Sequence, residues 1–404
     1  MSELSRMSGV SKGVISKIEN SETKRPEFKT ILSLAKALHI PFEQIIEYYI
    51  IVEQRPDVLK EILMESIQLS NMPLACKVAL HFLQTHYEDS ETLMEKLHRF
   101  VGDLSDNNSK LPLYEVIIKY ARERGMQRFY AKGLLQKFLI EMQDLKRLEE
   151  SFRLGEEVLH YVDFLNQEER IHFYYQMAFQ AHDLKKYEKC IELGKMGHAE
   201  DLTSNEMKER VAWAICNSYY RMDDIVGLEE HLKMYEVLEY QFVIERLKYY
   251  RAIILSRNGL FDEAIPLLKE CVQEASKNNR LHRVNILLEI LILIKDIDAV
   301  LKIFKQEEKN FAFDFTTPYN FTELGKYYKH KGVFLVSNDC FDEGIEAYLQ
   351  SMTYFSKINA REEIMLCSEE IYTLHIKKRK EIKLDLLERL KNVYNNVNTR
   401  KERE

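Results

Sequence analysis

The fold is most constrained by one stretch, residues 245–275, whose sequence is ERLKYYRAIILSRNGLFDEAIPLLKECVQEA. Its apolar residues recur at helical spacing in two runs, with a turn at Asn258-Gly259 between them. Gly259 can adopt the left-handed conformation that ends a helix, and Ala252 is small enough for two helices to approach each other. The stretch therefore predicts a helical hairpin. A single hairpin cannot bury its own apolar face, so we expect similar hairpins on either side.

The pattern within this hairpin resembles a tetratricopeptide repeat. That pattern alternates small and bulky residues at fixed spacing, and the four positions are occupied here by Ala252, Phe261, Ala264 and Leu268. The bulky position of Phe261 recurs, at intervals of 39, 38, 36, 36 and 44 residues, as Leu148, Tyr187, Ile225, Phe261, Ile297 and Phe341. The small position of Ala252 recurs as Leu139, Ala178, Cys216, Ala252, Leu288 and Gly332. These intervals are close to the tetratricopeptide period of about 34 residues, lengthened by loops.

The repeats define the predicted fold class and most of the domain organisation. We expect an all-α protein in which residues 131–360 form a right-handed solenoid of tetratricopeptide-like repeats. The segment at 341–345, FDEGI, nearly copies FDEAI at 261–265, which supports a true repeat. An irregular helical bundle that imitates a repeat is the alternative.

The composition agrees with an almost wholly helical protein. Seven prolines and 13 glycines among 404 residues are few, and 46% of the residues are hydrophobic, enough for a substantial core. The net charge of −7 argues against a chain coated with basic charge for nucleic acid, although it permits a local basic patch. Six scattered cysteines, no apolar N-terminal run and no uninterrupted apolar span predict a reduced, cytoplasmic protein that does not enter a membrane.

Residues 1–50 predict a separate small domain of short helices. A helix from Ser2 to Ser8, a turn at Gly9-Val10 and a second helix from Ser11 to about Asn20 form a helix-turn-helix arrangement. Six Lys and Arg against four Glu give residues 1–29 a net charge of +2, whereas the whole chain is acidic. The segment SELSRMSGVSKGVISKIENSETKRP resembles phage-repressor-like (Xre-type) DNA-binding domains.

In such domains the second helix enters the major groove, and its first residues meet the edges of the bases. The resemblance implies base contacts from Ser11, Lys12, Gly13, Ser16 and Lys17, and phosphate contacts from Lys24 and Arg25. Domains of this type have a further helix before the position of Ser2, which this sequence lacks. Either the start of the sequence is truncated or misassigned, or the domain is incomplete and binds DNA poorly. The alternative is a structural segment of four helices whose lysines keep it soluble.

Two segments flank the predicted repeats. Residues 51–130 are helical in pattern but fit the repeat register poorly, and we expect a connecting helical subdomain or degenerate repeats, with a loop at 102–112. Arg122, Arg124 and Arg128 form a basic cluster there, either a solvated helix face or an anchor for a carboxylate on a partner. Residues 361–404 predict closing helices that cap the solenoid.

A ligand of such an array is expected on its concave face, which the first helix of each hairpin lines. Aromatic, amide and cationic side chains suit an extended peptide, because they can hold apolar side chains, backbone groups and carboxylates. The repeat numbering that the resemblance supplies places there His172, Tyr175, Arg210, Trp213, Asn217, Tyr220, Arg221, Arg246, Tyr249, Asn285 and Lys329. The competing view is that aromatic residues at helical spacing are simply core.

Catalysis has little support in the sequence. There is no Gly-rich phosphate loop, no Cys or His pair at zinc-ligand spacing and no nucleophile elbow, and the 12 histidines are dispersed. We therefore expect neither an enzyme nor a bound cofactor or metal.

A helix-turn-helix followed by a tetratricopeptide array resembles the RRNPP group of peptide-responsive quorum-sensing regulators, and most of all its neutral protease regulator (NprR) branch. The resemblance implies a signalling peptide as ligand, promoter DNA as target and a homodimer or higher oligomer whose state changes with peptide. Related Rap proteins lack the DNA-binding domain and bind a response regulator of the sporulation phosphorelay. Such a response regulator is therefore the rival partner.

Overall fold

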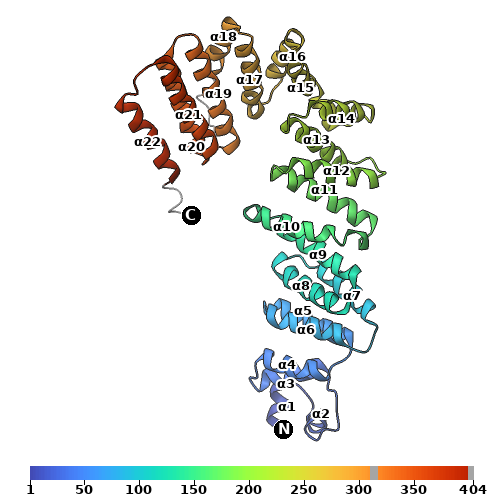
Figure 1. Ribbon diagram of the computed structural model, residues 1–404. Coiled ribbons are helices and arrows are strands. Elements are labelled where there is room, and N and C mark those ends of the chain that lie inside the picture. The colour runs from blue at the N-terminus through green and yellow to red at the C-terminus, as the bar shows by residue number, and fades with distance from the viewer. Residues whose placement is uncertain (310–316, 399–404) are drawn as a thin grey trace. The chain divides into compact units, whose positions relative to one another are not determined.

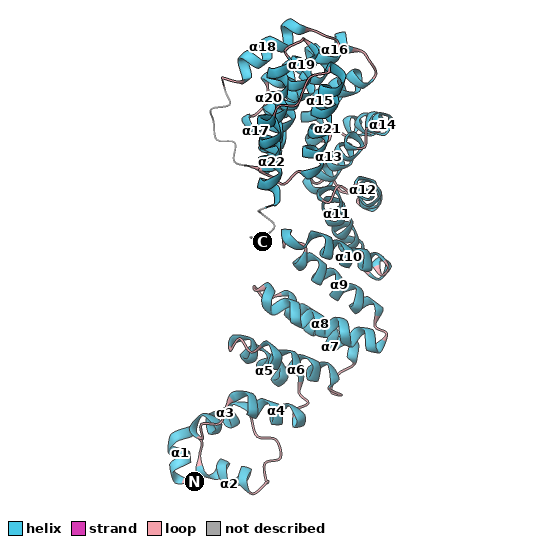
Figure 2. Cartoon of the chain, turned by 60° about the vertical axis from the view of Figure 1, so that its left-hand side comes forward, coloured by secondary structure: helices cyan, strands magenta, loops and turns pink. Residues whose placement is uncertain are grey.

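The computed structural model describes residues 1–309 and 317–398, and helices are the only regular secondary structure within them (Figures 1 and 2). These residues form 22 α-helices and two short 3₁₀ helices, and no strand occurs among them. The predicted all-α fold class is thus confirmed. Residues 310–316 and 399–404, which belong to the predicted repeat and closing segments, lie outside the described residues.

The chain divides into two compact units, and the first comprises Met1–Asp224. Four short helices at its start are followed by longer ones that pack as successive pairs. The helices of this unit are α1 (Ser2–Ser8), α2 (Lys12–Glu19), α3 (Phe28–Ala37), α4 (Phe42–Val52), α5 (Pro56–Gln68), α6 (Met72–Gln84), α7 (Ser90–Gly102), α8 (Asn107–Arg124), α9 (Gln127–Glu141), α10 (Leu148–Leu159), α11 (Gln167–Asp183), α12 (Tyr187–Glu200) and α13 (Glu206–Arg221), with 3₁₀ helices at Leu145–Arg147 and Val162–Phe164.

The second unit comprises Ile225–Glu404. Its helices are α14 (Ile225–Val237), α15 (Gln241–Arg257), α16 (Phe261–Gln273), α17 (Lys277–Leu293), α18 (Ile297–Glu307), α19 (Pro318–Ser337), α20 (Phe341–Ser356), α21 (Arg361–Lys378) and α22 (Leu384–Asn398). Among the described helices of the whole chain, none combines the length and hydropathy that a membrane crossing requires.

The repeat register predicted from the sequence coincides with the helix boundaries. Each residue at the bulky position is the first residue of a helix, and these helices are α10, α12, α14, α16, α18 and α20. Each residue at the small position lies within the helix before, in α9, α11, α13, α15, α17 or α19. The register marks helix starts because three residues separate the two helices in five of these six pairs, so the turn between them is nearly constant in length.

Close packing inside a hairpin explains why small residues are needed. Ala252 and Ala264 are completely buried where α15 meets α16. In the corresponding pair α19 and α20, a Cβ on Gly344 would lie 2.5 Å from a methyl of Val336 and 3.0 Å from its backbone nitrogen. Backbone atoms cannot move aside, so this pair of helices approaches too closely for any larger side chain at that position.

The segment before the repeats also consists of helical pairs. Helix α5 packs on α6, and α8 packs on α9, as Figure 1 shows for the lower part of the chain. The loop predicted for residues 102–112 is wrong in its second half, because α8 already begins at Asn107. The side chain of Asp106 accepts hydrogen bonds from the backbone N–H of Asn108 and Ser109, so the polar run caps a helix.

Candidate functional sites

The first candidate site is the surface of α2 in the N-terminal domain. Ser11 caps this helix, with its hydroxyl accepting a bond from Val14 N at 3.4 Å. Ile15 is the only buried residue of α2, and Phe28, Leu34 and Ile46 are buried on α3 and α4. Helix α2 packs on α1, and apart from Ile15 and the half-buried Ser16 and Ile18 its residues are exposed. Figure 2 shows α2 beside the connection that leads to α3.

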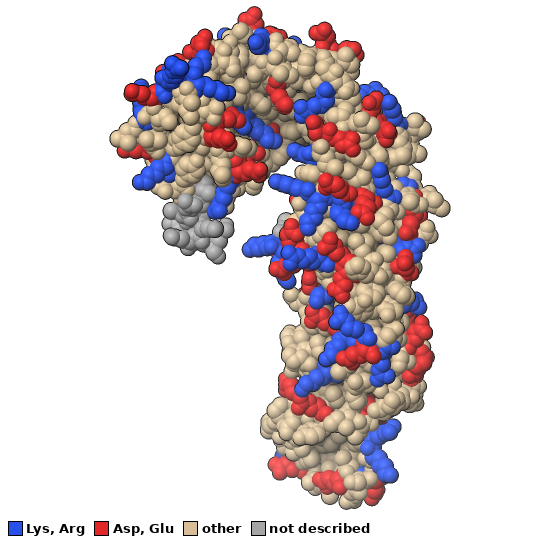
Figure 3. All heavy atoms as spheres, viewed as in Figure 1, with Lys and Arg blue, Asp and Glu red and all other residues tan. Residues whose placement is uncertain are grey.

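The residues predicted to contact DNA share this surface. Ser11, Lys12, Gly13, Lys17, Lys24 and Arg25 are exposed, and Ser16 is half-buried. The four cations among them pair with no carboxylate in the described part of the chain. Figure 3 shows basic side chains along one edge of this domain at the lower end of the view. The surface therefore offers uncompensated positive charge, which phosphates require.

A buried carboxylate, Glu53, and its hydrogen-bonded partner Tyr49 hold the end of the loop that carries Lys24 and Arg25. The hydroxyl of Tyr49 lies 2.9 Å from the carbonyl oxygen of Pro26, at the end of that loop, and 3.2 Å from Glu53. Arg55 donates to both oxygens of Glu53, at 2.9 and 2.7 Å. Burial would raise the pKa of Glu53, but the bonds from Arg55 outweigh it and hold the pKa at about 2. Glu53 is therefore charged at neutral pH and couples the N-terminal domain to α5.

The second candidate site lies on α11 and α13 of the first unit. A cavity of about 580 Å³ opens between their first turns and the 200–205 connection, and it is lined by His172, Tyr175 and Leu202 among others. His172 is exposed and forms no hydrogen bond within the described residues. Leu202, at the cavity edge, is 91% exposed. An open cavity with an apolar edge and a free imidazole can hold a ligand side chain.

Tyr175 is placed differently from the sequence-based expectation. Its ring is buried, and its hydroxyl donates to Asp201 at 2.9 Å, so only a small part of it reaches the cavity wall. Burial would raise the pKa of Asp201, but bonds from Thr203, Asn205 and Tyr175 hold it at about 2. Tyr175 is thus mainly a support for the connection that forms one side of the cavity.

Further along the same two helices, a histidine that the sequence analysis missed brings two predicted residues together. Asn217 donates its amide N–H to His182 Nε2 at 2.9 Å, and the ring of Trp213 lies 6.3 Å from the imidazole centroid. All three are half-buried. The other predicted residues of α13 lie at its ends, with Arg210 paired to Glu206 and Arg221 5.8 Å from the Tyr220 ring.

In the second unit, the predicted residues belong to a network of polar side chains. Tyr249 and His282 Nε2 are 2.8 Å apart, and His282 Nδ1 lies 3.3 Å from Glu323. Asn285 is 3% exposed and donates to the carboxylate and to the backbone carbonyl of Glu323, both at 2.9 Å. Asn285 therefore joins α17 to α19 inside the core and does not offer its N–H groups to a ligand, contrary to the sequence-based expectation.

Glu323 is the centre of this network. It is 3% exposed, and Lys326 adds a third partner at 3.1 Å. Burial would raise the pKa of Glu323, but His282, Lys326 and Asn285 hold it at about 2. Of the remaining predicted residues, Arg246 donates to the carbonyl of Phe242 at 2.7 Å and Lys329 pairs with Glu370 at 2.8 Å.

The basic cluster on α8 and α9 is largely neutralised within the protein. Arg122 bonds to the hydroxyl of Tyr130 at 2.5 Å and lies 3.5 Å from Glu157. Arg128 lies 3.6 and 3.7 Å from Glu91 and Glu95. Only Arg124, above the ring of Tyr120, has no carboxylate beside it in the described residues. The solvated-face interpretation therefore accounts for two of the three arginines.

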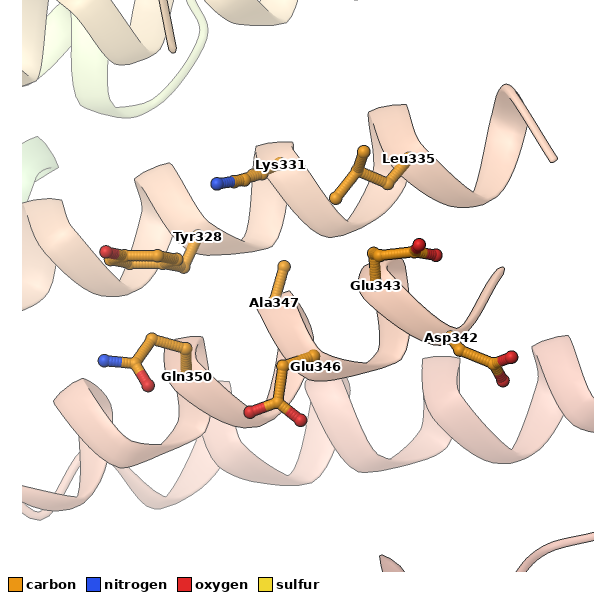
Figure 4. A pocket seen from close by; sticks show the side chains of 8 residues that line it. All are labelled: Tyr328, Lys331, Leu335, Asp342, Glu343, Glu346, Ala347 and Gln350. Atoms are coloured by element: carbon orange, nitrogen blue, oxygen red, sulfur yellow. The ribbon is translucent and has the colours of Figure 1, made fainter. Parts of the chain in front are cut away.

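A further pocket lies on the second unit, between α19 and α20. Figure 4 shows Tyr328, Lys331 and Leu335 on α19 opposite Ala347 on α20, while the side chain of Glu346 points away from α19. Of its four charged side chains, Lys331 pairs with Glu308 at 2.5 Å and Glu346 pairs with Arg389 at 2.6 Å, and the other two are Asp342 and Glu343. No group of three or more His, Cys, Asp or Glu side chains suited to a metal ion occurs among the described residues.

Comparison with known proteins assigns a class to the N-terminal domain. The sequence profile of the helix-turn-helix family matches residues 1–45, which cover α1 to α3 and the start of α4. That segment is therefore similar to helix-turn-helix domains, in agreement with its predicted arrangement. No curated protein matches the chain in sequence.

Two solved structures are similar in helical architecture over most of their length. One is aspartyl phosphate phosphatase F from Bacillus subtilis, with a TM-score of 0.41 and 10% identity, covering 81% of this chain and 96% of that chain. The other is a Rap protein complexed with competence and sporulation factor, with a TM-score of 0.37 and 11% identity, covering 86% and 96%.

Proposed function

We propose that the protein is a cytoplasmic quorum-sensing transcription regulator. A short signalling peptide binds to the first helices of the repeat hairpins, changes the conformation or oligomeric state, and so controls binding of promoter DNA. The observation that carries the proposal is the helix-turn-helix match at residues 1–45, together with four uncompensated cations on and after α2. The rest of the chain consists of helical pairs, so a ligand that regulates DNA binding would bind to these pairs.

The DNA part of the proposal rests on the chemistry of α2. Lys12 and Lys17 stand on exposed positions of the helix, and Lys24 and Arg25 follow it in the loop that Tyr49 ties down. Helix-turn-helix proteins place this helix in the major groove and bind phosphates with the flanking cations. The exposed Ser11 and Gly13, at the helix start, would then face the bases.

The peptide part of the proposal rests on the polar and aromatic groups of α11 and α13. The cavity beside His172 could take a peptide side chain, and the half-buried group of His182, Trp213 and Asn217 offers a ring and an amide oxygen for the peptide backbone. Tyr249 and Lys329 supply similar groups in the second unit. A peptide regulates only if it binds one state of the protein more tightly than the other.

The proposal can be tested with the full-length protein. Short peptides encoded beside its gene are titrated by calorimetry, the mass is followed by light scattering, and a fluorescent DNA fragment from upstream of the gene is titrated with and without peptide. We expect one peptide to bind, to change the mass or shape, and to alter DNA affinity at least tenfold, while its scrambled version does none of these.

Two results would contradict the proposal. If DNA affinity is the same with saturating peptide, the peptide does not regulate DNA binding. If the protein binds peptide but no DNA even at low salt, the helix-turn-helix interpretation fails, and a response regulator becomes the partner to test.

A further inference from the structure

A strongly basic segment lies where α21 is connected to α22. Residues 377–383, KKRKEIK, hold five cations and one acid in seven positions, whereas the whole chain has a net charge of −7. Figure 3 shows Lys and Arg gathered in the upper left of the view, over the connection between these two helices. We call residues 377–383 the basic connection.

The basic connection has a defined backbone. Lys380 N donates to the carbonyl of His375 at 3.0 Å, and the His375 ring nitrogen Nδ1 donates to the carbonyl of Lys380 at 3.2 Å. The ammonium group of Lys380 stands 4.1 Å from the centre of the Phe341 ring, and Lys378 pairs with Asp339 at 3.1 Å. These contacts attach the basic connection to the start of α20. The backbone that carries the remaining cations of the connection is therefore held in place.

Three cations of the basic connection are uncompensated. Lys377, Arg379 and Lys383 are exposed, and none of them pairs with a carboxylate within the part of the chain that the structure describes. Lys378 and Lys380 form ion pairs with Asp339 and Asp342, so their charges have a structural role. The three uncompensated cations have no such role.

Exposed aliphatic side chains border the same segment on both sides. Ile376, immediately before it, is 76% exposed, and Leu384, immediately after it, is 71% exposed. Tyr372 and Met365 precede Ile376 on α21 at spacings of four and eleven residues and are also exposed, so they share one face of the helix. The segment thus combines positive charge with a row of apolar side chains. Exposure of such a row to water is unfavourable and is typical of an interaction surface.

We propose that the basic connection and its flanking side chains, Ile376 and Leu384, bind an anionic lipid surface. Such a surface attracts Lys and Arg through its headgroups and accepts aliphatic side chains at the boundary of the acyl chains. A second copy of the chain fits less well, because two such segments would bring like charges together. Nucleic acid would use the cations but leaves the aliphatic groups in water. This surface is additional to the proposed regulatory function and does not depend on it.

The test is co-sedimentation of the full-length protein with vesicles of phosphatidylcholine alone or with one third phosphatidylglycerol. We expect binding only to the anionic vesicles. Each uncompensated cation is expected to contribute about fivefold to the partition coefficient, so K377Q/R379Q/K383Q should bind about a hundredfold more weakly. I376S/L384S keeps every charge and should still lose about tenfold, because the aliphatic groups no longer enter the interface.

The control variant K269Q/K302Q/K305Q removes the same charge from exposed, unpaired positions on α16 and α18. It should bind vesicles like the wild type. The proposal is overturned if the wild type does not bind anionic vesicles, if the control loses as much as the first variant, or if I376S/L384S has no effect. Weaker binding of a DNA duplex by K377Q/R379Q/K383Q, with vesicle binding unchanged, would assign the segment to nucleic acid instead.

Discussion

Replacing Lys12 and Lys17 by alanine should halve the salt dependence of DNA binding. Both side chains are exposed on α2, and neither pairs with a carboxylate in the described residues, so their charges are available for phosphates. The fold should survive the change, because both lysines are exposed and the single buried residue of α2, Ile15, is kept. The variant therefore tests which surface meets DNA and not whether the domain folds.

The magnitude follows from the number of uncompensated cations. Each phosphate contact contributes about −0.9 to the slope of log affinity against log salt, so Lys12, Lys17, Lys24 and Arg25 together give about −3.6. The double variant keeps two of them and should show about −1.8. Between 50 and 200 mM salt, affinity should fall about 150-fold for the wild type and about 12-fold for the variant. An oligomer multiplies both slopes equally, so their twofold ratio is the quantity to compare.

Fluorescence anisotropy with a labelled DNA duplex at five salt concentrations measures both slopes. The matched control is K29A/K36A, which removes two exposed lysines of α3 that also pair with no carboxylate in the described residues. Its slope should equal that of the wild type. An unchanged slope for the α2 variant, or a flattened slope for the control, would refute the assignment of α2 as the DNA-binding helix.

Three further predictions concern the core and the peptide site. Glu323→Ala should lower the free energy of unfolding by about 3–5 kcal/mol in urea titrations, because it removes the buried carboxylate that accepts from Asn285 and pairs with His282, while Glu289→Ala, at an exposed ion pair with Arg257, should cost less than about 1 kcal/mol. The urea midpoint should be constant above about pH 4.5 and fall towards pH 2, because the pKa values of Glu53, Asp201 and Glu323 are lowered to about 2 and folding loses their contribution once they are protonated; a midpoint that rises on acidification would contradict these assignments. Asn217→Ala should weaken binding of the cognate peptide by about 1–3 kcal/mol in calorimetry, and unchanged affinity would place the amide outside the peptide site.

The sequence was sufficient to predict the helices of the repeat region and where half of them begin. Ile225, Phe261, Ile297 and Phe341 each start a helix, because the period of the pattern reflects a turn of nearly constant length between packed helices. It was insufficient at Asp106, where a run of polar residues is typical both of a loop and of a helix cap. Such residues cap a helix where backbone N–H groups at its start need an acceptor, and they form a loop otherwise. The structure decides between the two because it shows where those N–H groups lie.

The candidate peptide residues show a different limit. Spacing places a residue on one face of a helix, but it does not tell whether a polar neighbour closes over it. Tyr175 is buried against Asp201, which is 26 residues away, and Asn285 against Glu323, which is 38 residues away.

Hydrogen bonds between polar residues about one repeat apart separate the structural residues of the predicted peptide-binding face from those that a ligand can use. Asn217 and His182 are separated by 35 residues, and Tyr249 and His282 by 33, about one helical turn less than the repeat interval, so each pair joins the first helices of adjacent hairpins. Such pairs hold neighbouring helices together, and their hydrogen bonds are already used. A ligand should therefore depend most on face residues without a partner at that spacing, and His172, exposed beside the cavity of the first unit, is the clearest of these. His172→Ala should accordingly weaken peptide binding without changing the urea midpoint, whereas Asn217→Ala should change both.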